Sequence, residues 1–229
     1  MAEVKRAERG YSSPLRAQQA AATRRAVLDA ARELFIAQGY GATTIDQIAA
    51  AAGVSKPTVF TAVGNKQTVL SAVRDVAMAG DDEHVVVAER PLAQRIRAET
   101  DQRRAVVLLA ELITGIGGRY AQIDAVLRGA AQSGEPELRE LWRTSEDQRL
   151  FGARLWVTTV AEKGPLRDGT DIDSAVDLLW LYMSPDLYFR LVHERGWPPD
   201  RFRAWLADTL CRLLLPAPHE AVPDTPGPG

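Results

Sequence analysis

The sequence predicts an all-α protein with a small N-terminal helical domain and a larger helical body. Apolar residues recur at spacings of three and four along most of the chain, and no segment alternates as a strand does. Short polar residues precede several of these segments and glycines follow them, as at helix ends. The 229 residues, 46% of them hydrophobic, can bury a sizeable core. We expect a disordered arm over residues 1–20, a first domain over 21–80, a body over 81–215 and a disordered, proline-rich tail over 216–229.

Composition excludes several classes of protein. The single cysteine, Cys211, can form neither an internal disulfide nor a cysteine-cluster zinc site, and the three histidines lie far apart in the sequence. The N-terminal segment is charged and lacks the apolar core of a secretory signal. The longest apolar stretch, residues 105–118, is interrupted by Glu111 and is too short to span a bilayer. We therefore expect a cytoplasmic protein with no membrane partner, no metal and no cofactor.

The net charge of −2 conceals an uneven distribution of charge. Residues 1–75 hold ten Lys and Arg against six Asp and Glu, whereas the rest of the chain holds 18 against 24. A basic front end with an acidic body is typical of a protein that turns one end towards a polyanion. An ordinary solvated surface can carry the same excess, so the distribution is only a first indication.

Four helices are expected in the first domain. They span residues 23–38, 44–52, 56–63 and 66–78. Thr23 is the expected N-cap of the first helix and Gly39 its expected stop. Thr44 and Gln47 match a capping box, in which the two side chains satisfy each other's backbone N–H groups. Gly53 is expected to end the second helix in a left-handed conformation.

Further helices are expected in the body. They span residues 92–98, 101–132, 135–162, 171–183, 184–194 and 198–215. The second of them contains Gly115, Gly117 and Gly118, at which we expect a bend. The tail is too rich in proline to continue the last helix.

Residues 44–63, TIDQIAAAAGVSKPTVFTAV, match a helix-turn-helix. Two short helices meet at a glycine-containing turn, and small alanines allow them to approach closely. Val59 and Val63 are expected to face the core, which leaves Lys56, Pro57, Thr58 and Thr61 outside. Short hydroxyl and apolar groups suit base edges and thymine methyl groups in a major groove, and a lysine suits guanine or phosphate. The alternative is an ordinary three-helix corner with a solvated outer face.

Residues 24–75 also resemble the N-terminal domain of the TetR family of transcriptional regulators. The resemblance covers about a quarter of the chain and rests on Ala31, Leu34, Phe35, Gly39, Tyr40, Thr43, Thr44, Ile45, Ile48, Ala49, Ala52, Gly53, Val54, Ser55, Lys56, Thr58, Val59, Phe60, Asn65, Lys66 and Leu70. It implies a homodimer that binds a palindromic operator in double-stranded DNA. It also implies a repressor that a small-molecule effector releases from that operator.

The resemblance further implies which residues contact DNA. The expected set is Thr43, Thr44, Ser55, Lys56, Pro57, Thr58, Phe60, Thr61 and Lys66. Thr44 and Lys66 are expected to hold phosphates, and helix N-termini suit phosphate in any case. Phe60 departs from the family, which usually has a tyrosine there whose hydroxyl touches phosphate. Phenylalanine cannot make that bond, so we expect it to pack against the DNA backbone or its own helix.

By the same resemblance, the body binds the effector and a second copy of the chain. Aromatic side chains on the central helices are the candidate pocket residues: Tyr120, Trp142, Phe151, Trp156 and Tyr182. Few charges lie on the apolar faces of these helices, so an apolar or aromatic effector is expected. Core packing explains each aromatic residue equally well. The last two long helices are rich in apolar residues, and two copies of each would form a four-helix dimer interface.

Enzymatic alternatives lack support in the sequence. It contains no nucleophile motif, metal-ligand cluster or phosphate-binding loop, so we expect no catalytic residue and no enzyme. The remaining alternatives are a helical small-molecule-binding protein or enzyme with no DNA role, and a regulator that responds to a protein partner.

Overall fold

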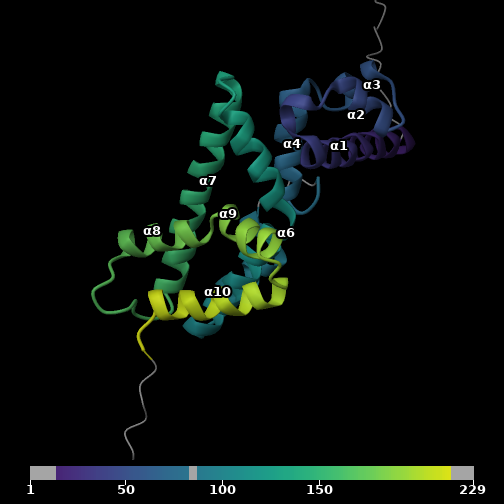
Figure 1. Cartoon of the computed structure of the whole chain (residues 1–229). Coiled ribbons are helices and arrows are strands. Elements are labelled where there is room, and N and C mark those ends of the chain that lie inside the picture. The colour runs from purple at the N-terminus through teal and green to yellow at the C-terminus, as the bar shows by residue number, and fades with distance from the viewer. Residues whose placement is uncertain (1–13, 83–86, 218–229) are drawn as a thin grey trace, which may run out of the picture.

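The computed structural model describes residues 14–82 and 87–217, which form helices joined by turns, with no strand in these ranges. The predicted all-α class is confirmed. Figure 1 shows the four N-terminal helices gathered at one end of the molecule and α10 at the opposite end. The expected arm and tail fall mostly on residues 1–13 and 218–229, which lie outside the described residues.

The N-terminal helices are α1 (Pro14–Ala42), α2 (Ile45–Ala51), α3 (Lys56–Ala62) and α4 (Lys66–Ala79). The expected start of the first helix at Thr23 is wrong, because α1 already begins at Pro14. Its first turns, PLRAQQAAA, place proline where a helix tolerates it and then run through strong helix formers, so propensity outweighs a later cap. Gly39, with φ 79° and ψ 167°, interrupts the helical conformation at the predicted stop.

The body helices follow the expected order. They are η1 (Val87–Glu89), α5 (Pro91–Ala98), α6 (Gln102–Ala131), α7 (Pro136–Ala161), α8 (Ile172–Tyr182), α9 (Pro185–Tyr188), η2 (Phe189–Glu194) and α10 (Pro199–Leu214). The segment expected as one helix over 184–194 is divided into a single α-turn and a π-helical stretch. α6 continues as one helix across its three glycines.

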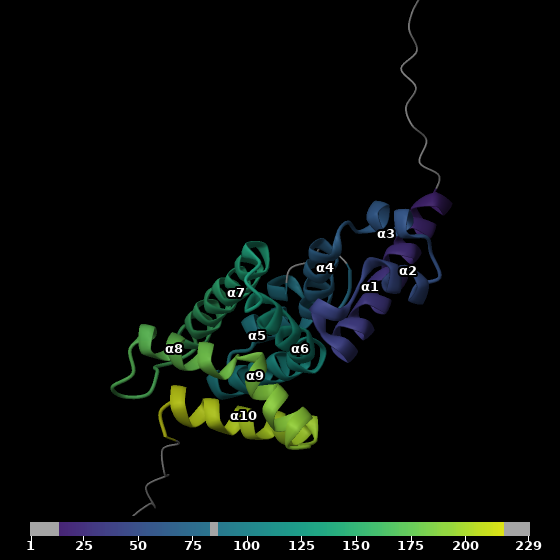
Figure 2. The ribbon, with the colours of Figure 1, turned by 45° about the horizontal axis from the view of Figure 1, so that its top comes forward.

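Helix α6 is the central element of the molecule. It packs against α1 and α4 on one side and against α5, α7, α9 and α10 elsewhere, an arrangement visible from the two orientations of Figures 1 and 2. By length and composition α6 could cross a membrane, but the core helix of a soluble protein passes the same test, and half of its most apolar window is buried here. Its packing on the surrounding helices explains its apolar character.

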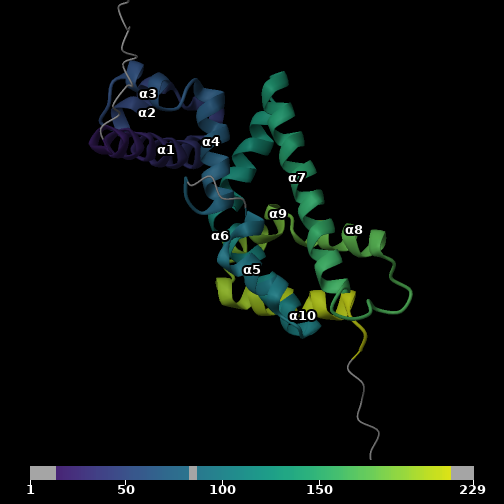
Figure 3. The same ribbon diagram turned by 180° about the vertical axis from the view of Figure 1, so that it is seen from behind.

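The two hydrophobic cores meet along α6. Its first half contributes Leu109 and Ile113 to the core of the body, while its second half contributes Ile123 and Leu127 to the core of the N-terminal domain. Both cores therefore include residues of α6, and the domain boundary expected at residue 80 stays a prediction. Figure 3 shows α4 at the junction between the N-terminal domain and α6, and both α4 and α1 pack on α6.

Candidate functional site

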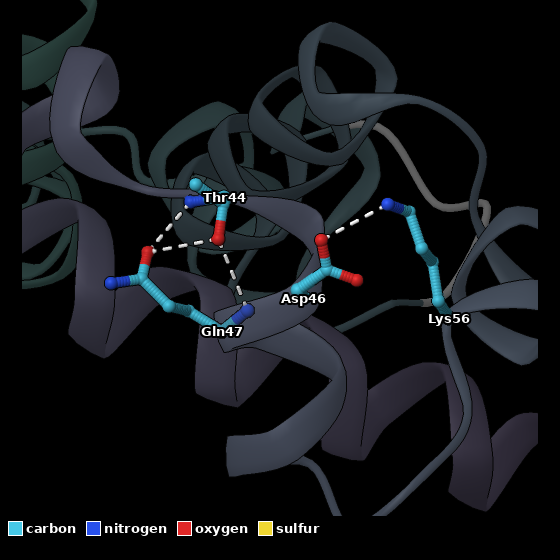
Figure 4. Close-up of polar contacts among 4 residues, drawn as sticks. All are labelled: Thr44, Asp46, Gln47 and Lys56. Atoms are coloured by element: carbon cyan, nitrogen blue, oxygen red, sulfur yellow. Dashed lines mark hydrogen bonds and ion pairs between the residues drawn. The ribbon is translucent and has the colours of Figure 1, made fainter.

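The turn before α2 is organised by a capping box. The Thr44 side chain accepts from the Gln47 backbone N–H, and the Gln47 carboxamide oxygen accepts from the Thr44 backbone N–H at 2.8 Å. The Thr44 hydroxyl also lies 3.1 Å from that oxygen (Figure 4). The predicted box is confirmed. The backbone N–H groups of Thr44 and Gln47 are therefore satisfied by each other's side chains, and both residues are exposed.

The turn between α2 and α3 fixes the direction of α3. Gly53 has φ 67°, the left-handed conformation that was expected there. Ser55 caps α3 by accepting from the backbone N–H of Thr58 at 3.3 Å, and Val59 is fully buried beneath the helix. The opposite face of α3 is open to solvent and includes Ser55, Lys56, Pro57, Phe60 and Thr61.

Lys56, at the start of α3, forms an ion pair with Asp46 of α2, with 3.0 Å between Nζ and Oδ2 (Figure 4). Both side chains are at least half exposed, so the pair contributes little to stability and can be exchanged for another anion. Phe60 is 47% exposed, which is unusual for phenylalanine and leaves its ring free on the outer face of α3.

Lys66 has a structural role that the sequence did not indicate. Its Nζ donates to the backbone oxygens of Tyr40 at 3.0 Å and Thr43 at 2.9 Å, and lies 4.1 Å from the centre of the Tyr40 ring. It thereby ties the start of α4 to the turn that precedes α2. An ammonium has three N–H donors, so one remains for another acceptor.

Thr43 cannot contact DNA directly, and its place in the expected set is corrected. The residue has no exposed surface, and its hydroxyl donates to the Gly39 backbone oxygen at 2.8 Å. It closes the turn between α1 and α2 instead. The sequence placed it beside Thr44 in the motif but did not show that neighbouring residues of this turn point in opposite directions.

The body contains a cavity of about 510 Å³ between α4, α6, α7 and the segment that begins α9. Most of its wall is apolar, with Met78 from α4, Ile113 and Ile116 from α6, and Leu155 from α7. This volume falls within the range of small-molecule sites in proteins. A second hollow, of about 590 Å³, lies between the end of α1 and the second half of α6.

Three of the five predicted pocket residues line the cavity of the body: Tyr120, Phe151 and Trp156. Phe151 is 73% exposed and therefore belongs to the rim. The prediction is wrong for Trp142, which packs against the N-terminal core, and for Tyr182, which packs against Trp205. Trp142 and Trp156 share one helix, but fourteen residues separate them by roughly 21 Å along its axis, so they reach different cores.

The cavity wall carries more charged groups than the helix patterns indicated. Arg74 from α4 and Asp124 from α6 both line the cavity, with exposed fractions of 6% and 5%. Ser145 and Arg149 of α7 lie in the same wall. Burial raises the pKa of Asp124, and burial together with the neighbouring Asp124 raises the pKa of Tyr120. The helical pattern placed Arg74 among charged residues such as Asp75, so only the packing reveals that it is buried.

Arg74 also changes the interpretation of the basic N-terminal segment. It was counted in that segment, but it faces the body. Arg24, counted with it, forms an ion pair with Asp82 at 2.7 Å. The N-terminal domain therefore presents less positive charge to a polyanion than the count from the sequence gives. Shape and short side chains, as well as charge, define the outer face of α3.

An exposed second helix in a helix-turn-helix, attached through α4 to a helical body with a cavity, defines a regulator that binds DNA. Residues 27–73 match the model of the family described as bacterial regulatory proteins, tetR family. The chain is 30% identical over 159 residues to YdeS, an uncharacterised helix-turn-helix-type transcriptional regulator of Bacillus subtilis, covering 69% of this chain and 74% of the relative. The chain belongs to the TetR family and is a DNA-binding transcriptional regulator.

Solved structures share the whole fold. One is NalD, the secondary repressor of the MexAB-OprM multidrug efflux pump in Pseudomonas aeruginosa, with a TM-score of 0.63 at 22% identity, covering 86% of this chain and 98% of that one. Another is FadR from Bacillus subtilis in complex with stearoyl-CoA, with a TM-score of 0.63 at 16% identity, covering 81% of this chain and 96% of that one. At these identities the likeness establishes the fold alone.

Proposed function

We propose that the protein is a homodimeric repressor that a small molecule, bound in the body cavity, releases from its operator. The observation that carries the proposal is the position of α4. Arg74 and Met78 of this helix line the cavity, while Lys66 at its start holds the turn that leads into α2. A ligand that shifts the cavity end of α4 therefore also shifts the DNA-binding helices.

The proposed DNA contacts follow the exposed surface. Ser55, Lys56, Pro57, Thr58, Phe60 and Thr61 enter the major groove with α3, and Thr44 and Lys66 hold phosphates on either side. A phosphate oxygen takes the place of the Gln47 carboxamide oxygen at the Thr44 N–H, which is the group best placed to bind an anion at this turn. The exposed Asp46–Lys56 pair opens so that Lys56 reaches a base or a phosphate.

The proposed dimer interface lies on α8 and α10. Of the apolar residues expected there, Leu179, Phe202, Leu206, Leu210 and Leu214 are buried within one copy and are not available. Leu181 is 58% exposed, and Leu178, Trp205 and Leu213 are half-buried. Sedimentation should report a dimer that Leu181→Arg converts to monomer. Leu150→Arg, at an exposed leucine of α7, is the matched control.

Selection of bound duplexes from a random pool tests the DNA half of the proposal. The expected product is an inverted repeat whose half-site centres lie about 34 Å apart, or a multiple of that distance. A single asymmetric site bound by one copy would contradict the dimeric arrangement. A reporter gene placed behind the selected site should rise in expression when the regulator is deleted, whereas a fall would identify an activator.

The effector half is tested by linkage. A ligand bound in the cavity must weaken operator binding by the same factor by which the operator weakens binding of the ligand. A ligand that binds equally to free and DNA-bound protein would exclude release as the mechanism.

A regulator of this kind acts where the genome is, so we place it in the cytoplasm.

A further inference from the structure

The wall of the body cavity holds buried polar groups that are donors without acceptors. The Nε of Arg74, the Nε of Arg149 and the hydroxyl of Tyr120 are buried and make no hydrogen bond of good geometry among the described residues, although the Tyr120 hydroxyl lies beside Asp124 and Ser145. All three residues line the cavity. Buried polar groups are normally satisfied, so a cluster of unsatisfied donors in one wall indicates an acceptor that the protein alone does not provide.

Arg74 is the strongest of these groups. Its guanidinium donates to the Asp75 carboxylate at 2.7 Å and to the Gln148 carboxamide oxygen of α7. The Asp75 carboxylate is 61% exposed and therefore well hydrated, and Gln148 carries no charge. The close counter-charge of this buried guanidinium is therefore a largely exposed carboxylate, and its buried Nε is left without an acceptor.

The other acidic groups of the same wall do not supply a counter-charge to Arg74. Glu146 is already paired with Arg149, its neighbour on α7. Burial raises the pKa of the Asp124 carboxyl, which favours its neutral form. A cationic ligand would meet two arginines in this wall, and the carboxylates of Asp75 and Glu146 are already paired with them.

The rest of the cavity is suited to an apolar body of moderate size. Ile113, Ile116, Leu155 and Trp156 line it, and its volume of about 510 Å³ accommodates a small organic molecule rather than a macromolecule. The polar groups lie near Arg74, so a ligand with one polar head and an apolar body matches the wall.

We infer that the effector of this regulator is a small organic acid whose carboxylate binds Arg74 and Tyr120 and whose apolar body fills the remainder of the cavity. The inference rests on the proposed function, since it takes the cavity to be the effector site. The carboxylate provides the acceptor for the unsatisfied donors and adds a negative charge inside the cavity to that of the exposed Asp75. It competes with Gln148 for the same guanidinium, so its binding bears directly on the contact between α4 and α7.

Matched probes test the chemistry on the full-length, DNA-free protein. We would titrate 4-phenylbutyrate, 4-phenylbutyramide and 4-phenylbutylamine by calorimetry, and repeat the series with octanoate, octanamide and octylamine. In each series the acid should bind at least about tenfold more tightly than the amide, as one charge-assisted hydrogen bond requires. An amide or amine that binds as tightly as the acid, or no acid binding at about 1 mM, would overturn the inference.

Two variants connect the preference to named residues. Arg74→Met should reduce acid binding about tenfold and leave amide binding within about twofold, because the volume is kept while the charge is removed. Tyr120→Phe should reduce acid binding about threefold, and urea denaturation of this variant checks its fold, because the hydroxyl lies beside Asp124 and Ser145. Arg139→Met, at an exposed position of α7 outside the cavity wall, is the control. Equal acid binding by wild type and both cavity variants would overturn the assignment.

Operator binding is measured separately. If the acids bind but do not release the selected operator, the inference stands and release fails as a mechanism. If another compound releases the operator while the acids do not bind, release stands and the inference is overturned.

Discussion

The guanidinium of Arg74 on α4 donates a hydrogen bond to the carboxamide oxygen of Gln148 on α7 within the cavity of the body. This contact joins α4, which leads from the DNA-binding domain, to α7 in the wall of the cavity. It is therefore the place where occupancy of the cavity and the position of α4 most directly affect each other.

Gln148→Leu should have effects of opposite sign on stability and on binding. The free energy of unfolding should fall by about 1–3 kcal/mol, because a buried guanidinium loses an acceptor. 4-Phenylbutyrate should bind about threefold more tightly, because it no longer displaces Gln148. Urea denaturation and calorimetry provide the two measurements. Weaker binding of the acid by this variant would mean that Gln148 assists the ligand rather than competing with it.

Phe60→Tyr should strengthen binding to any DNA sequence by about tenfold, since the added hydroxyl can donate to a phosphate from an exposed position on α3. Fluorescence anisotropy with the selected operator and with an unrelated duplex measures the change. Phe151→Tyr, an equally simple change at an exposed site of the body, should leave both affinities unchanged. A gain confined to the operator would place residue 60 at a base rather than at the backbone.

Thr44→Ala should lower the free energy of unfolding by about 1 kcal/mol, which is the usual cost of a lost N-cap. Thr44→Ser should restore it. Gln47→Ala removes the other half of the box and should weaken operator binding less than Thr44→Ala, because a phosphate is proposed to replace its carboxamide. The proposed phosphate at the Thr44 N–H would be rejected if Gln47→Ala were the more harmful change for DNA binding.

Lys66→Met should affect both stability and DNA binding. The backbone oxygens of Tyr40 and Thr43 lose a charged donor, so the free energy of unfolding should fall by about 1–3 kcal/mol. The slope of log affinity against log salt concentration should fall by about 0.9 if the third N–H holds a phosphate. A stability loss with an unchanged salt slope would assign Lys66 to positioning α4 alone.

Asp124→Asn should change the pH dependence of stability. Burial raises the pKa of Asp124 in the folded protein above its ordinary value, so the folded state binds the proton more tightly than the unfolded chain does. The wild type should therefore lose stability relative to the variant as pH rises through and above the ordinary aspartate range. Thermal unfolding at a series of pH values measures this difference. Asp147→Asn, at an exposed position of α7, should follow the wild type.

The N-terminal domain was predictable in detail because its signals are local. A capping box requires only Thr44 and a glutamine three residues later, and the turn at Gly53 requires one left-handed residue. Periodicity also gave the order of the body helices. Local signals misplaced the start of α1, where a plausible cap at Thr23 competed with a longer run of strong helix formers.

The cavity was predictable only in part. Aromatic residues at helical spacing identified Tyr120 of α6 and Trp156 of α7 in its wall. The same pattern included Trp142, which lies about four turns from Trp156 on α7 and packs against another core. Arg74 and Asp124 were missed altogether, because a charged residue on a helix is normally solvated and a sequence does not reveal which exceptions are buried.

The sequence by itself determined the helices, the helix-turn-helix and the family, because each depends on residues that are close together along the chain or share a repeating pattern. The tertiary structure decided which side chains face the DNA, which close a turn, and which charges are enclosed in the body. Thr43 and Thr44 are adjacent, yet one is buried and the other exposed. Arg74 lies on the same helix as Lys66, yet it faces the cavity. Such differences arise because burial depends on helices packed from distant parts of the chain, and that packing exists only in the folded molecule.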